Sequence, residues 1–154
     1  MATSNTSSSF RRKRALIIGN NNYSRPESKL RHCINDADDL CKLLKTMNFE
    51  VTTYHDLTDG QMTEYIRDFQ NTIINGDLVI FYFSGHGYQV NGKNYLMPVD
   101  DAQIETDEDV EDKAFEVDRT LDRLAKRNPS YVTIFILDCC RQYWPTQTPK
   151  TRGN

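Results

Sequence analysis

The feature that most constrains the fold of this chain is a set of short, almost uninterrupted apolar runs. Residues 15–19 (ALIIG), 77–83 (DLVIFYF) and 131–137 (YVTIFIL) are rich in branched and aromatic side chains. Such runs are typical of strands that are covered on both faces, so we expect the second and third to be fully buried. Residues 51–57 predict one more strand.

Three segments between these strands carry apolar residues at helical spacing, which predicts amphipathic helices. Thr58 and Gln61 fit a capping box at the start of the second helix. The apolar positions are Ile34, Ala37, Leu40, Cys41 and Leu44 in the first segment, Met62, Tyr65, Ile66, Phe69 and Ile73 in the second, and Val117, Leu121, Leu124 and Ala125 in the third.

The order of these elements predicts an α/β fold. Strands that alternate with helices form an open, mostly parallel sheet with helices on both faces. The dipeptide Asn91-Gly92 lies between two polar-apolar alternations and predicts a hairpin inserted after residues 77–83. We expect a disordered leader over residues 1–12, one domain over residues 13–144 and a tail over residues 145–154.

Composition excludes several classes of function. The 154 residues suffice for one domain, and 19 Lys plus Arg against 22 Asp plus Glu give a net charge of −3, so we expect no nucleic-acid partner. No apolar run reaches the ~18 residues of a membrane span, and the first ten residues lack the apolar centre of a secretory signal. We therefore expect a cytoplasmic protein without a membrane partner, and cysteines that stay reduced.

Chemically reactive side chains follow two of the predicted strands. Residues 84–87 (SGHG) follow the run 77–83, and residues 138–141 (DCCR) follow the run 131–137. The loop after the first strand leads to Asp36. Because the carboxyl ends of parallel strands meet at one edge of a sheet, a histidine, a thiol and carboxylates are expected there together.

A thiol and an imidazole at one edge are the minimum for acyl transfer. A thiol has a pKa of ~8.5, and a nearby imidazole accepts its proton and later donates one to a leaving amine. The glycines on both sides of His86 would let a substrate approach and leave a backbone N–H for an oxyanion. The structural alternative is a hydrogen-bonded loop histidine with Cys139 and Cys140 as small buried residues. Zinc binding is a third alternative, although the thiols lack the paired spacing of structural zinc sites.

Four motifs resemble the caspase-related cysteine peptidases, and among them the paracaspase and metacaspase branches. They are ALIIGNNNY, LRHCINDADDL, the apolar run that ends in FSGHG, and FILDCCR, in the family's order. The resemblance implies a three-layer caspase-like fold and the catalytic large-subunit portion of such a peptidase. It places the nucleophile at Cys140, the general acid/base at His86, and the oxyanion donors at the backbone N–H groups of Gly87 and Cys140.

The resemblance also implies cleavage after Arg or Lys, with Asp36 and Asp138 as substrate-binding acids. A buried pair of carboxylates would attract a guanidinium and reject acidic side chains. From the residues alone, Asp36 is equally well a first-turn helix acid and Asp138 a solvated acid at a strand end. The expected partners are proteins and peptides with basic residues at the cleavage site, and a second copy of the chain.

The sequence departs from the family's pattern after Cys140. The chain runs only to Asn154 and offers no further strand, whereas a complete caspase-like unit continues into a small-subunit portion, so we expect an incomplete sheet. A catalytically silent scaffold or dimerisation module is therefore the alternative function. Residues 99–112 are acidic, and the resemblance to calcium-dependent metacaspases suggests calcium there. Because no EF-hand spacing is present, a flexible solvated loop is favoured and no cofactor is expected.

Overall fold

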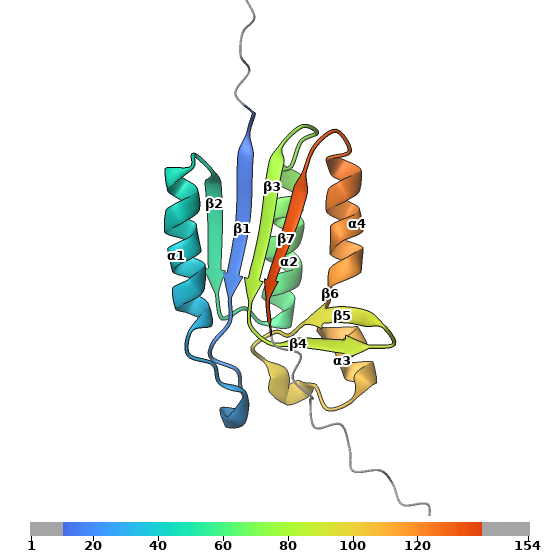
Figure 1. Ribbon diagram of the computed structural model, residues 1–154. Coiled ribbons are helices and arrows are strands. Elements are labelled where there is room, and N and C mark those ends of the chain that lie inside the picture. Colours follow the sequence, from blue (N-terminus) through green and yellow to red (C-terminus); the bar gives the residue numbers. More distant parts are fainter. Residues whose placement is uncertain (1–10, 140–154) are drawn as a thin grey trace, which may run out of the picture.

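The computed structural model describes residues 11–139, and every structural statement below concerns these residues. Four parallel strands form the main sheet in the order β2-β1-β3-β7. Helices lie on both faces of this sheet (Figure 1), which confirms the predicted α/β fold class. The strands are β1 (Lys13–Gly19), β2 (Glu50–His55), β3 (Leu78–Ser84) and β7 (Thr133–Asp138), and the long helices are α1 (Cys33–Thr46), α2 (Asp59–Thr72) and α4 (Val117–Arg127).

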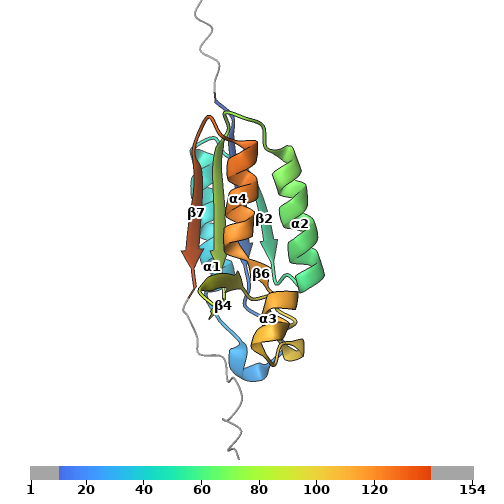
Figure 2. The same cartoon turned by 90° about the vertical axis from the view of Figure 1, so that its right-hand side faces the viewer.

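The two faces of the sheet hold separate apolar layers because successive strand residues point to opposite faces. On β3, Phe81 and Phe83 pack with α2 and α4, whereas Ile80 and Tyr82 pack with α1. Figure 2 views the sheet nearly edge-on and shows α2 and α4 together on one side. The face of β3 to which a residue belongs therefore decides which helices surround it.

A smaller antiparallel sheet begins after the two residues that follow the carboxyl end of β3. Its strands are β4 (Gly87–Val90), β5 (Lys93–Leu96) and β6 (Phe115–Glu116). Asn91 and Gly92 have φ values of 49° and 80°, the left-handed backbone that a two-residue hairpin turn requires. The predicted hairpin is thus confirmed, and it places β4 directly after residues 84–86.

Two expectations from the sequence are wrong. Residues 131–137 are not fully buried: β7 is an edge strand of the described sheet, and Ile134, Ile136 and Leu137 are 41%, 39% and 38% exposed. Residues 99–112 are not a flexible loop, since they contain the 3-10 helix η2 (Asp101–Gln103) and the helix α3 (Asp107–Lys113). A second 3-10 helix, η1 (Pro26–Ser28), lies between β1 and α1.

None of the helices within residues 11–139 is both long enough and apolar enough to cross a bilayer. The capping box of Thr58 and Gln61 at the start of α2 is confirmed. Most of the expected leader and the whole expected tail lie outside the described residues, so these boundaries remain predictions.

Candidate active site

The ends of β3 and β7 lie next to each other at one edge of the main sheet. The two strands are parallel neighbours, and Ser84 is the register partner of Asp138. The backbone N–H of Gly85 donates to the carbonyl oxygen of Asp138 at 3.4 Å, so the pairing extends to the last residues of both strands. His86 follows Ser84 by two positions, as Cys140 follows Asp138. Cys140 itself lies outside the described residues.

The His86 side chain is buried, at 2% exposure, and is held by the loop between β1 and α1. Its Nε2 atom lies 2.7 Å from the backbone carbonyl oxygen of Ser28, at the end of η1. Because a carbonyl only accepts hydrogen bonds, Nε2 carries the proton in the neutral ring. Nδ1 is then the ring nitrogen that can accept a proton, which is the state that a general base requires.

Tyr23 holds the backbone of His86 from the same loop. Its ring lies against the imidazole, with 4.5 Å between the ring centroids and 57° between the ring planes. The backbone N–H of His86 donates to Tyr23 Oη at 2.8 Å, and Tyr23 Oη donates to the carbonyl oxygen of Met97 at 3.3 Å. The Met97 N–H donates in turn to the His86 carbonyl oxygen at 2.9 Å. Three hydrogen bonds thus form a closed ring around the peptide of His86.

Tyr23, Ser28 and Met97 are residues for which the sequence predicted no role. Tyr23 is the last residue of the ALIIGNNNY motif, and its place in this motif is the one sequence signal that could have pointed to a role. Ser28 and Met97 act through backbone atoms, which carry no side-chain signal. Only the fold brings these three residues to His86.

The glycines beside His86 are required by internal packing, whereas their expected role in substrate approach stays a prediction. A Cβ atom at Gly85 would lie 2.6 Å from Tyr23 Oη and 2.8 Å from Phe83 Cζ. A Cβ atom at Gly87 would lie 2.8 Å from Cys139 Sγ. Both distances are shorter than packed side chains allow, so the backbone must pass these neighbours without a side chain.

The N–H of Gly87 points away from the neighbouring strand β5. In an antiparallel pair, hydrogen-bonded and non-hydrogen-bonded residue pairs alternate. Met97 donates to His86, so the next pair, Gly87 with Leu96, belongs to the non-hydrogen-bonded kind. The Gly87 N–H therefore donates no hydrogen bond to β5, which is a condition that an oxyanion donor must meet.

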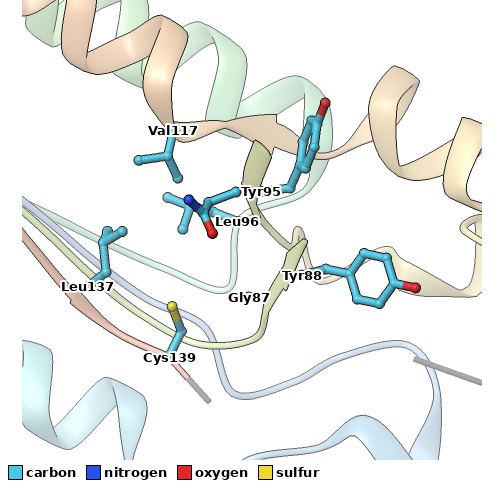
Figure 3. A pocket seen from close by; sticks show the side chains of 8 residues that line it. Gly87, Tyr88, Tyr95, Leu96, Val117, Leu137 and Cys139 are labelled. Carbon is cyan, nitrogen blue, oxygen red and sulfur yellow. The ribbon is translucent and has the colours of Figure 1, made fainter. Parts of the chain in front are cut away.

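A pocket of about 270 Å³ opens beside Gly87 on the α4 side of the sheet. Leu137 and Cys139 from the β7 end of the chain face residues of the hairpin across it, and the sulfur of Cys139 points toward it (Figure 3). Eight residues line the pocket: Gly87, Tyr88, Asn94, Tyr95, Leu96, Val117, Leu137 and Cys139. Cys139 packs with the apolar layer on this side.

The two acids assigned to substrate binding are exposed in this chain, which corrects the expectation of a buried pair. Asp36 lies in the first turn of α1, and Asp138 ends β7. Tyr82 Oη donates to Asp138 Oδ2 at 3.3 Å. Burial raises the pKa of Tyr82 to about 12, and the charges of Asp138 and Asp36 add to this effect. Burial also raises the pKa of Cys33, again with contributions from both carboxylates. Both carboxylates therefore raise the pKa of the same two groups, Tyr82 and Cys33.

The cysteines within residues 11–139 are distributed over both faces of the sheet. Cys41 packs in the α1 layer and Cys139 packs in the layer of α2 and α4. Cys33, Cys41 and Cys139 form no disulfide with one another. Between Arg11 and Cys139, no group of three or more His, Cys, Asp or Glu side chains could hold a metal ion. The described residues thus provide no support for the zinc alternative.

A family model described as a caspase domain matches residues 12–153. The chain belongs to the caspase family. Two curated relatives match this caspase domain over 130 residues, which are 84% of this chain and 15% of each relative. They are mucosa-associated lymphoid tissue lymphoma translocation protein 1 of Homo sapiens, at 32% identity, and its Mus musculus homolog, at 30% identity. The chain therefore spans only a small part of the length of these relatives.

The caspase family is a family of cysteine peptidases, so the family resemblance expected from the four motifs is confirmed. Within this caspase domain, the structure brings His86, Gly87 and Asp138 to one edge of the sheet, and it places Asp36 in the first turn of α1. The placement of Cys140, both as nucleophile and as oxyanion donor, lies outside the described residues and stays a prediction.

Proposed function

We propose that this caspase domain is a cysteine endopeptidase that cleaves peptide bonds after Arg or Lys. Cys140 is the nucleophile and His86 is the general acid/base. The backbone N–H groups of Gly87 and Cys140 stabilise the oxyanion, and Asp36 and Asp138 bind the basic side chain. The protein acts in the cytoplasm and belongs to the paracaspase branch, with proteins and peptides as substrates and without a resident cofactor.

The observation that carries the proposal is the orientation of the His86 imidazole at the shared end of β3 and β7. Its Nε2 is engaged by the Ser28 carbonyl oxygen, so Nδ1 is the proton acceptor. Ser84 and Asp138 are register partners at the ends of β3 and β7. His86 comes two residues after Ser84, and Cys140 comes two residues after Asp138.

The reaction then proceeds in two acyl-transfer steps. His86 Nδ1 takes the proton of the Cys140 thiol, and the thiolate sulfur attacks the scissile carbonyl carbon. The carbonyl oxygen becomes an oxyanion beside the Gly87 amide, and His86 returns the proton to the leaving amine. Water, activated by the same imidazole, adds to the thioester and releases the acid product together with the thiol.

The proposed preference for basic residues is supported by charge. Asp138 ends β7, and Asp36 lies in the first turn of α1, which begins beside Gly19 at the end of β1. Two negative charges therefore lie at the carboxyl edge of the sheet. A guanidinium placed there gains charge-assisted hydrogen bonds, whereas a substrate carboxylate meets like charges.

The decisive experiment compares fluorogenic peptides that end in Arg, Lys or Asp before the fluorophore. The chain and its Cys140→Ala variant are assayed with and without calcium, and with a fused dimerisation domain. We expect turnover of the Arg and Lys peptides that depends on Cys140, together with labelling of Cys140 by a thiol-reactive peptide inhibitor. Cleavage of the Asp peptide instead would refute the basic specificity, and calcium dependence would show a cofactor that the proposal does not include.

Replacement of Asp138 tests the binding of the basic side chain. For Asp138→Asn we expect kcat/KM for the Arg peptide to fall about tenfold to hundredfold, because a charge-assisted hydrogen bond becomes a neutral one. The matched control is Asp39→Asn, an exposed acid on α1 that pairs with Lys42. Equal kcat/KM values for the two variants would contradict the assigned role of Asp138.

A catalytically silent scaffold or dimerisation module is the second candidate function. The observation that favours it is the exposed apolar face of the edge strand β7, which is suited to association with another chain. Absence of any turnover dependent on Cys140, even with calcium and enforced dimerisation, would favour this candidate.

A further inference from the structure

The loop between β1 and α1 surrounds His86 on two sides. Tyr23 contributes its ring and its hydroxyl group, and Ser28 contributes its carbonyl oxygen. Two hydrogen bonds anchor the loop to other segments: the N–H of Asn20 donates to the Ser84 carbonyl at 2.9 Å, and the N–H of Ser24 donates to the Val99 carbonyl at 2.7 Å. The N–H of Leu30 donates to the Asn21 carbonyl at 2.9 Å and closes the loop on itself. The imidazole is thus held by a loop that is itself hydrogen-bonded to the rest of the domain.

The side chain of Tyr23 bonds directly to the backbone of His86. Its side chain is fully buried, at 0% exposure, and packs in the apolar cluster that also holds Tyr95 and Met97. The hydroxyl accepts from His86 and donates to Met97, so both of its hydrogen-bonding functions are used. Gly85 lacks a side chain at the point where a methyl group would meet this hydroxyl at 2.6 Å. The local backbone is therefore built around the Tyr23 oxygen.

We propose that Tyr23 is the positioning residue of His86. It keeps the imidazole oriented with Nε2 donating to the Ser28 carbonyl oxygen, so that Nδ1 is the ring nitrogen that accepts the proton of the nucleophile. This inference rests on the proposed peptidase function for its kinetic consequence. Its structural content, the tautomer and orientation of His86, is independent of turnover. A packing role alone would be filled by the ring of Tyr23, whereas the positioning role requires the hydroxyl group.

The test replaces the hydroxyl and retains the ring, in Tyr23→Phe. The matched control is Tyr65→Phe, which removes the hydroxyl of a half-buried tyrosine that stacks on Tyr54 at 4.2 Å, on α2. The first readout is the long-range ¹H–¹⁵N spectrum of the imidazoles in the full chain. The chain has three histidines, and the His86 signals are assigned by their loss in His86→Gln.

We expect the Nε2–H tautomer for His86 in the unsubstituted chain, and a shift of the tautomer ratio toward Nδ1–H by about fivefold in Tyr23→Phe, as expected for loss of one buried hydrogen bond. Tyr65→Phe should leave the ratio unchanged. An Nδ1–H tautomer in the unsubstituted chain, or an unchanged ratio in Tyr23→Phe, overturns the proposal. Because this readout needs no substrate, an inactive chain would refute the peptidase function without deciding the role of Tyr23.

The second readout is kinetic. In Tyr23→Phe we expect kcat for the Arg peptide to fall about tenfold with KM changed less than twofold, because a misoriented base slows proton transfer and leaves substrate binding intact. A change in KM alone, or an equal fall in Tyr65→Phe, overturns the kinetic part. Amide spectra verify folding, and Gly85→Ala, whose methyl group displaces the Tyr23 oxygen, provides a second variant with the same expected shift of the His86 tautomer.

Discussion

At the scale of single residues, the surroundings of His86 show how a reactive side chain is fixed by atoms that are not themselves reactive. The orientation of the imidazole comes from a carbonyl oxygen, and the His86 backbone is held by a tyrosine hydroxyl. The neighbouring glycines make this arrangement sterically allowed, since Gly85 clears Tyr23 and Gly87 clears Cys139. Substitutions at these glycines therefore test packing directly.

Gly87→Ala should destabilise the domain by about 1–3 kcal/mol, because its methyl group overpacks the site of the Cys139 sulfur. Adding Cys139→Ala removes the sulfur and should recover at least half of this loss. Urea unfolding of the two single variants and the double variant measures the coupling. Strictly additive effects would show that the contact between Gly87 and Cys139 is not the cause.

At the scale of elements, the acidic stretch after the hairpin is organised by a capping box. Thr106 precedes α3, and Asp109 Oδ2 accepts hydrogen bonds from the backbone N–H of Glu105, the N–H of Thr106 and the Thr106 hydroxyl, at 3.0–3.1 Å. These bonds, first the one from Glu105, lower the pKa of Asp109 to about 2, and Lys113 contributes as well. A segment with many like charges thus forms a helix because one of its acids satisfies the helix end.

Asp109→Ala should lower the melting temperature at pH 7 more than Asp112→Ala, an exposed acid on the same helix. Because the folded-state pKa lies below the ordinary value of 3.8, the stabilisation by Asp109 is present above pH 4 and is lost as the pH falls toward 2. The difference between the two variants should therefore vanish near pH 2. Thermal unfolding followed by circular dichroism measures it, and a difference independent of pH would contradict the assigned cause.

At the scale of the whole molecule, the described sheet is covered unevenly. α1 packs on the residues of β1 and β3, whereas Ile134 and Ile136 of β7, on the same face, remain about two-fifths exposed. An apolar edge strand with open hydrogen-bonding groups favours pairing with another chain. The second-copy partner expected from the sequence stays a prediction, and the edge of β7 is the surface at which we expect it to bind.

Ile136→Lys should reduce any self-association of the chain, because a charge on the exposed face of β7 opposes strand pairing and apolar contact. The control is Leu43→Lys, which makes the same kind of change at an exposed apolar residue of α1. Light scattering coupled to gel filtration at several concentrations gives the mass. Equal masses for the two variants across the concentration range would show that β7 is not the contact surface.

The sequence by itself determined the order of the main strands and helices, the hairpin at Asn91-Gly92 and the capping box at Thr58. These features depend on local periodicity, turn chemistry and capping, which neighbouring residues specify. It also placed His86 and Asp138 at one edge of the sheet, because the carboxyl ends of parallel strands meet there. α3 was missed because the charge of residues 99–112 masked a capping signal at Thr106 and Asp109.

Only the tertiary structure decided how His86 is held and which strands are covered. The hydrogen bonds of His86 with Tyr23 and Ser28 join residues about sixty positions apart in the sequence. One of these bonds uses the backbone carbonyl of Ser28, which no sequence pattern marks. Similarly, the runs 77–83 and 131–137 have nearly the same composition, yet β3 lies inside the described sheet and β7 at its edge. Burial depends on which neighbours a strand acquires in the fold, and composition does not specify those neighbours.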